Sequence, residues 1–170
     1  MEIIDLYRAD HRKSGRTGIR GEQIPPGLFM NIVFVCIFNT KGEMLIQQRH
    51  PVKKMGGKWD VSAGGAVKSG ETSARAAARE AHEELGRRYR PERLTKILSV
   101  YYRSAFHDFY AVTDDFDVSE LTLQESEVVD AKWASRETVR GMIESGEFMG
   151  IYAEFVDLLF AMKDRKGIMR

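Results

Sequence analysis

An almost unbroken apolar run from Phe29 to Phe38 constrains the fold of this chain more than any other feature of its sequence. The run is rich in Val, Ile and Phe, and it is preceded by Pro25-Pro26-Gly27 and followed by Lys41-Gly42. A run of this length between such turn residues predicts a strand that is buried on both faces, as in the centre of a sheet.

The remaining elements follow from turn residues and from the spacing of apolar residues. We expect further strands at Ile3–Tyr7, after a turn at Lys13–Arg16, and at Met44–Arg49, Thr95–Tyr102, Phe106–Thr113 and Val128–Trp133. The segment Trp59–Val67 is short and rich in small residues. Helices are expected at Thr72–Leu85, Arg136–Glu144 and Ile151–Met162, and a basic loop at Pro51–Lys58. This order predicts one α/β domain over residues 1–170, with residues 1–27 as an N-terminal extension.

Composition narrows the class of protein. The 170 residues carry a formal net charge of +1, which gives no strong attraction to nucleic acid or to an anionic membrane. A single cysteine, Cys36, permits no internal disulfide and suits a reducing compartment. No signal peptide is recognisable, and no apolar run approaches the roughly 18 residues that span a bilayer. We therefore expect a cytoplasmic protein without nucleic-acid or membrane partners.

Three glutamates near the end of the helix expected at Thr72–Leu85 carry the candidate chemistry. Glu80, Glu83 and Glu84 stand at i, i+3 and i+4, so their carboxylates share one helix face. Three like charges repel unless a cation lies among them, and a hard divalent ion such as Mg²⁺ is the natural partner for carboxylate oxygens. Glutamate-rich helices are more often simply solvated, so this triad alone would not indicate a metal site.

The residues around the triad make the pattern specific. The segment resembles the Nudix box, G-x5-E-x7-R-E-U-x-E-E-x-G-U, where U is a bulky apolar residue. Two U positions depart from it, because Ala81 is small and Arg87 is charged. Seven positions match at the required spacing, and they are Gly65, Glu71, Arg79, Glu80, Glu83, Glu84 and Gly86.

The resemblance implies the Nudix fold, a mixed β-sheet between α-helices, here with an N-terminal β-hairpin extension. It implies that Glu80, Glu83 and Glu84 hold Mg²⁺, with Mn²⁺ as a substitute, and that Glu71 and Arg79 orient the segments that carry them. Family members often use a further glutamate before a strand tryptophan, a position that Glu127 occupies and for which Glu125 is a weaker candidate. The catalytic set is therefore Glu83, Arg79 and Glu127, with Glu83 or Glu127 as the base.

Substrate-binding residues are suggested by position. Arg49 ends a strand that leads into the basic loop, where it would meet a phosphate or simply face solvent. Trp59 would stack on a base or an isoprenoid, or pack in the core. Gly64 and Gly65 would let the backbone approach a ligand. The apolar stripe on the last helix is expected to face the core or a second copy in a homodimer.

The expected activity is Mg²⁺-dependent cleavage of a phosphoanhydride in a nucleoside diphosphate-linked or other small organic diphosphate. One alternative is an enzyme like isopentenyl-diphosphate isomerase, whose branch of the family this chain resembles. That enzyme has Cys and His in the segment W-T-N-S-V-C-G-H, where an ungapped alignment places Gly64 and Ala66. The other alternative is a Nudix module that senses a nucleotide without hydrolysing it, although such modules tend to lose the box glutamates, all of which are present here.

Overall fold

The structure is a computed structural model that describes residues 1–165. Its strands are β1 (Ile3–Tyr7), β2 (Lys13–Ile19), β3 (Met30–Phe38), β4 (Met44–Arg49), β5 (Trp59–Asp60), β6 (Ala63–Ala66), β7 (Thr95–Tyr102), β8 (Ala105–Thr113) and β9 (Val128–Ala134). Its α-helices are α1 (Ser73–Leu85), α2 (Arg136–Glu144) and α3 (Ala153–Met162), and short 3₁₀ helices lie at Pro91–Arg93 and Val118–Glu120.

Strand β3 lies at the centre of a mixed sheet. The strand order is β5-β4-β3-β8-β7, with β6 also pairing with β3 and β9 with β4. The β3–β8 ladder is parallel and runs from Met30 opposite Ala105 to Phe38 opposite Thr113, whereas the other pairings are antiparallel. The predicted central buried strand is therefore confirmed.

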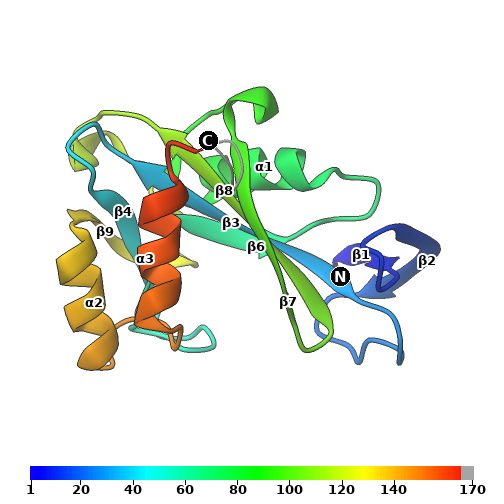
Figure 1. The fold of residues 1–170 in the computed structure, drawn as a ribbon. Coiled ribbons are helices and arrows are strands. Elements are labelled where there is room, and N and C mark those ends of the chain that lie inside the picture. The colour runs from blue at the N-terminus through cyan, green and yellow to red at the C-terminus, as the bar shows by residue number, and fades with distance from the viewer. Residues whose placement is uncertain (166–170) are drawn as a thin grey trace.

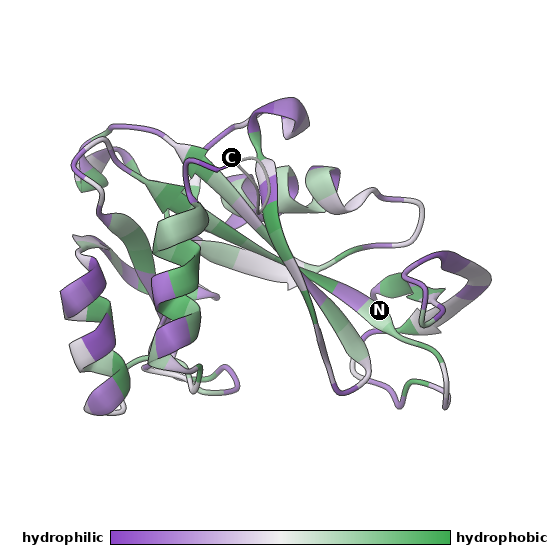
Figure 2. Cartoon of the chain, in the orientation of Figure 1, coloured by the Kyte–Doolittle hydropathy of each residue, from purple (hydrophilic) through white to green (hydrophobic). Residues whose placement is uncertain are grey.

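Helices cover both faces of this sheet, with α2 and α3 on one side and α1 on the other (Figure 1). Alternation along β3 divides its side chains between two cores. Val33, Val35 and Ile37 pack with the alanines of α1, while Cys36 and Phe38 pack with residues of α2 and α3. The central strands are coloured mostly as hydrophobic, whereas α2 and α3 combine hydrophobic and hydrophilic residues (Figure 2). The predicted mixed sheet between helices is confirmed.

The N-terminal strands β1 and β2 form a separate two-stranded antiparallel sheet at one end of the molecule (Figure 1). The turn that we predicted at Lys13–Arg16 is wrong, because these residues lie inside β2. Gly15, at φ +82°, instead lies where the β1–β2 register shifts, as expected for a bulge. The chain reverses earlier, where the Arg8 amide donates to the Arg12 carbonyl and His11 stacks on Phe106 with 3.9 Å between ring centroids.

A buried carboxylate on β8 links several elements on the α1 side of the sheet. Asp108 is fully buried and accepts hydrogen bonds from Asn31 Nδ2 (3.1 Å), Ser73 Oγ (2.5 Å), Ser99 Oγ (2.7 Å) and Lys96 Nζ (2.7 Å). Burial by itself would raise the pKa of Asp108, but the bonds from Lys96, Ser73, Ser99 and Asn31 hold it below its ordinary value of 3.8.

We expect Asp108→Asn to lower the free energy of unfolding by about 3 kcal/mol, because a buried ion pair is broken and donors lose a charged acceptor. Since the folded pKa is depressed, the stability from ionised Asp108 is complete above the unfolded pKa and is lost as pH falls through the folded pKa. Urea midpoints measured between about pH 6 and 3 should therefore decline less steeply in the variant than in the wild type. Parallel declines would contradict this assignment.

No helix within residues 1–165 combines the length and apolar character needed to cross a membrane.

Candidate active site

Helix α1 carries the candidate carboxylates, and its two ends are fixed by capping residues. Thr72 caps the first turn by accepting a hydrogen bond from the Arg75 amide, 3.3 Å away. Gly86 ends the helix in the left-handed conformation at φ +72°, as a C-terminal glycine does. Ala76, Ala77, Ala81 and Leu85 are buried against the sheet, so the Glu80–Glu84 turn is held beside strand β6.

The two glycines of β6 allow this close approach. A Cβ atom on Gly65 would lie 2.1 Å from Glu80 Oε1, and a Cβ atom on Gly64 would lie 2.9 Å from the Val33 carbonyl oxygen. The Gly64 amide donates to Glu84 Oε2 at 3.2 Å. A side chain on Gly65 would therefore displace the Glu80 carboxylate, whereas a side chain on Gly64 would collide with strand β3, and Gly64 contacts Glu84 through its amide.

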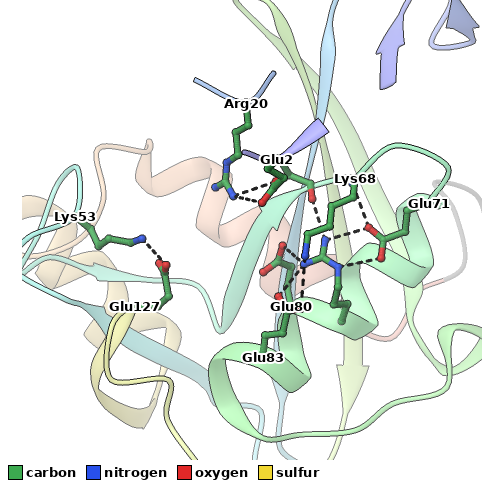
Figure 3. Close-up of polar contacts among 10 residues, drawn as sticks. Glu2, Arg20, Lys53, Lys68, Glu71, Glu80, Glu83 and Glu127 are labelled. Carbon is green, nitrogen blue, oxygen red and sulfur yellow. Dashed lines mark hydrogen bonds and ion pairs between the residues drawn. The ribbon is translucent and has the colours of Figure 1, made fainter. Parts of the chain in front are cut away.

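Arg79 links three glutamates of the box, Glu71, Glu80 and Glu83, into one hydrogen-bond network, and these three are labelled in Figure 3. Its Nε and Nη2 atoms donate to the two oxygens of Glu71, each at 3.0 Å, and Nη2 also donates to the Ala66 carbonyl at 3.0 Å. Its Nη1 atom donates to Glu80 Oε1 at 2.7 Å and to Glu83 Oε2 at 2.9 Å. Although burial opposes the charge, Glu71 and Glu80 raise the pKa of Arg79 above its ordinary value, so this side chain is a permanent cation.

The three glutamates differ in environment. Burial, joined by the charge of Glu80, raises the pKa of Glu84 to about 8, and burial also raises the pKa of Glu80. Gln47 Nε2 donates to Glu84 Oε2 at 2.9 Å, whereas the buried Gln47 Oε1 has no partner. Glu83 is exposed. Its Oε2 atom accepts from Arg79, and its Oε1 atom lies 3.7 Å from Lys68 Nζ.

The carboxylate oxygens of these residues are suitable ligands for a divalent cation, but the side chains are not spaced to hold one in this structure. Across residues 1–165, no three His, Cys, Asp or Glu side chains are gathered closely enough to hold a metal ion. Arg79 Nη1 instead supplies the positive charge between Glu80 and Glu83. Arg79 makes no hydrogen bond to Glu84, and the buried Gln47 Oε1 has no partner, so oxygen acceptors remain here that Arg79 does not satisfy. The donor set therefore fits Mg²⁺ or Mn²⁺.

Two of the predicted substrate-binding side chains are engaged within the protein. Arg49 donates from Nη1 to Asp60 Oδ2 at 3.1 Å and from Nε to the Lys54 carbonyl at 3.1 Å, so it shapes the basic loop at Pro51–Lys58. Trp59 is only 8% exposed and belongs to the core on the α2–α3 side, with Lys132 Nζ 4.1 Å from its ring centre. Of the two roles considered for Trp59, this burial favours core packing over substrate stacking.

Glu127 lies in the segment before β9 and makes an ion pair with Lys53 of the basic loop. Its carbonyl accepts the His50 amide at 2.8 Å, and the nearby Gln124 amide donates to the Glu84 carbonyl at 3.0 Å. Figure 3 shows the Lys53–Glu127 pair apart from the network around Arg79. The structure thus does not bring the Glu127 carboxylate into contact with the box glutamates.

Two further residues, Cys36 and Arg20, bear on the composition of the site. Cys36 is fully buried, and burial raises the pKa of its thiol, which excludes it as a nucleophile. Arg20, at the end of the N-terminal hairpin, is paired with Glu2 at 3.3 Å and lies close enough to Glu80 to lower its pKa. No local pattern in the sequence predicts the proximity of Arg20 to Glu80, because it depends on how the hairpin packs.

Comparison with known proteins agrees with this geometry. A family model described as NUDIX domain matches residues 28–156. An uncharacterized Nudix hydrolase of Listeria monocytogenes is 39% identical over 169 residues, which cover 99% of each chain. The chain belongs to the Nudix hydrolase family. Members of this family are enzymes that act on small molecules and generally use divalent metal ions.

Further relatives support the same assignment. Nudix hydrolase 3 of Arabidopsis thaliana is 30% identical over 84% of this chain, but the match covers only 20% of that longer protein. Among solved structures, DR0079 from Deinococcus radiodurans superposes with a TM-score of 0.75 at 28% identity, covering 92% of this chain and 98% of that one. A MutT protein from Methanosarcina mazei, with a TM-score of 0.62 and 22% identity, covers 81% of this chain and 96% of its own, and shares the fold.

Proposed function

We propose that this Nudix hydrolase cleaves a phosphoanhydride bond in a small organic diphosphate with the help of Mg²⁺, for which Mn²⁺ is a substitute. The observation that carries the proposal is the packing of Glu80 and Glu84 against the glycines of β6, with Glu83 beside them and Arg79 joining the set to Glu71. Bound at these carboxylates, the metal would neutralise the diphosphate and polarise phosphorus.

The side chains of the protein have separate tasks in this proposal. Arg79 fixes Glu71, Glu80 and Glu83 relative to one another, and the buried Glu80 and Glu84 are the principal metal ligands. Glu83 is the exposed carboxylate and takes a proton from the attacking water. The water oxygen bonds to phosphorus as the anhydride bond breaks and the second phosphate group leaves. Glu127, held away from this group by Lys53, is the weaker candidate for the base.

The basic loop at Pro51–Lys58 is proposed to receive the rest of the substrate. It lies next to the segment that carries Glu127 and is stiffened by the contacts of Arg49. Lys53 and Lys54 lie on it, which suits an anionic ligand. We further propose one domain over residues 1–170, a cytoplasmic location, and no nucleic-acid or membrane partner. We also propose a homodimer formed through two exposed apolar residues, Tyr152 immediately before α3 and Leu158 on α3.

Metal removal tests this function. Protein treated with EDTA and desalted should release no phosphate from a panel of nucleoside diphosphate sugars, oxidised nucleoside triphosphates, dinucleoside polyphosphates and isoprenoid diphosphates. Addition of Mg²⁺ or Mn²⁺ should restore release from at least one class, detected with an added phosphatase or pyrophosphatase. Metal-independent release, or nucleotide binding by calorimetry without any release, would contradict the proposal, and the second result would indicate a sensing module.

A further inference from the structure

We infer that the N-terminal hairpin is a working part of the active site, and that Asp5 is the positioning residue through which it acts. This inference rests on the proposed function, because it concerns the loop that supports the proposed metal ligands. Asp5 does not touch the carboxylates of α1 itself. Its effect reaches them through the loop Lys68–Gly70, Glu71 and Arg79.

The first observation is that strand β1 continues its pairing onto this loop. Ile4 forms an antiparallel bridge with Lys68, and the Ser69 amide donates to the Ile3 carbonyl at 2.9 Å. Ile4 and Leu6 are buried together with Ala66 at the end of β6. The hairpin is therefore attached to the strand and loop that lead into α1, and it is held there by backbone and apolar contacts together.

The second observation is the concentration of hydrogen bonds on Asp5. Its Oδ2 atom accepts from the Gly70 amide at 2.9 Å and from Lys13 Nζ at 2.6 Å, and its Oδ1 atom accepts from Ser69 Oγ at 2.9 Å. Burial opposes the charge on Asp5, yet the bonds from Lys13, Gly70 and Ser69 hold its pKa below the ordinary value. Lys13 Nζ also donates to the Glu71 carbonyl at 3.2 Å. The hairpin thus fixes three consecutive residues of the loop, Ser69 to Glu71.

The third observation is that the contacts continue from the loop to the carboxylates. Glu71 Oε2 accepts the Lys68 amide at 3.2 Å, and both Glu71 oxygens accept from Arg79. Arg79 in turn donates to Glu80 and Glu83. Each of these hydrogen bonds includes a charged side chain or a backbone amide, and such bonds restrict the positions of the two groups they join. Figure 3 shows this continuity from Lys68 and Glu71 to Glu80 and Glu83.

The physical consequence concerns the precision of the site. Gly70 adopts φ +80°, and the Asp5 carboxylate accepts the amide of this residue. Without the Asp5 carboxylate, the Gly70 amide loses its acceptor and Ser69 keeps only its backbone bond to Ile3. Glu71, whose carbonyl is still bound by Lys13, can then shift further with the loop. Arg79 then has a less fixed partner on one side, so the spacing of Glu80 and Glu83 widens. Residues that support metal ligands in this indirect way typically change affinity or activity about 10- to 100-fold when mutated.

The test compares Asp5→Ala, Asp5→Asn and a matched control, Ser14→Ala. Ser14 Oγ donates to the Leu6 carbonyl within the hairpin and does not reach the loop, so its loss reports hairpin stability alone. We expect Asp5→Ala to weaken Mn²⁺ binding, measured by electron paramagnetic resonance without substrate, about tenfold, and to lower kcat with little change in KM. Asp5→Asn keeps one acceptor oxygen and should fall between Asp5→Ala and wild type, whereas Ser14→Ala should match wild type in Mn²⁺ affinity.

Equal Mn²⁺ affinities in Asp5→Ala and Ser14→Ala would overturn the inference, because the hairpin would then have only a structural role. A second measurement does not depend on metal: the Arg79 Nε–H proton, followed by ¹⁵N NMR, should exchange faster in Asp5→Ala than in Ser14→Ala. Equal exchange would also overturn the inference. Wild-type protein that hydrolyses no compound would contradict the proposed function and leave this comparison of variants intact.

Discussion

The substitution Glu83→Gln should lower kcat roughly 10²- to 10⁴-fold, the range typical for loss of a general base. Glu83 lies in the last turn of α1 and is exposed. One of its carboxylate oxygens is close to Arg79 and the other to Lys68. Glutamine keeps the length of the side chain and one acceptor for Arg79, but it cannot take a proton from water. Because the position is exposed, the urea unfolding midpoint should stay close to that of the wild type.

His82→Gln is the matched control for this prediction, since His82 is the exposed neighbour on the same helix and the side-chain partners of Arg79 are Glu71, Glu80 and Glu83 instead. It should retain the rate of the wild type. Steady-state kinetics on the best substrate of the panel measures both variants. Near-normal turnover in Glu83→Gln would remove Glu83 as the base, and a parallel Glu127→Gln variant would show whether that role falls to Glu127 instead.

A second large effect is expected for Arg79→Met, which should lose activity and also about 3 kcal/mol of unfolding free energy. The substitution removes one cation and leaves Glu71 and the buried Glu80 without their main partner. Breaking a largely buried ion pair from one side is costly because the remaining charges stay desolvated. Equilibrium urea denaturation measures the stability, and the rate is measured on the fraction that is folded.

Two further variants show whether the effect belongs to the network. Arg75→Met removes an exposed arginine from the first turn of the same helix and should change stability by less than about 0.5 kcal/mol. Arg79→Lys keeps the charge but lacks the planar group that binds both oxygens of Glu71, so it should recover only part of the loss. Equal stability of Arg79→Met and Arg75→Met would contradict the central position that we give to Arg79.

Most of the element order could be predicted from the sequence because the signals were local. Phe29–Phe38 is apolar at every position except Asn31, and a strand in the middle of a covered sheet buries such a run. Helix α1 is bounded by Thr72 and Gly86, whose side-chain and backbone chemistry set helix ends. The spacing of Arg79, Glu80, Glu83 and Glu84 follows from helical periodicity, so their shared location was also predictable.

The features that could not be predicted depend on contacts between distant segments. The reversal of the hairpin at Arg8–Arg12 depends on His11 packing against Phe106, a residue far away in the chain. The side of the sheet on which Trp59 packs depends on α2 and α3 covering that face. The position of Glu127 depends on its ion pair with Lys53, which no local pattern indicates. The anchoring of the box loop by Asp5 likewise requires the packed hairpin.

The most direct test of the account is the location of a bound metal ion, since the carboxylates of α1 are arranged around Arg79 in the present structure. Crystals soaked in MnCl₂ and measured at the manganese absorption edge would locate such an ion. The account predicts an anomalous peak within coordination distance of carboxylate oxygens of Glu80 and Glu84, with Glu83 beside it. No peak at these residues in well-soaked crystals, or a peak held by other side chains, would contradict it.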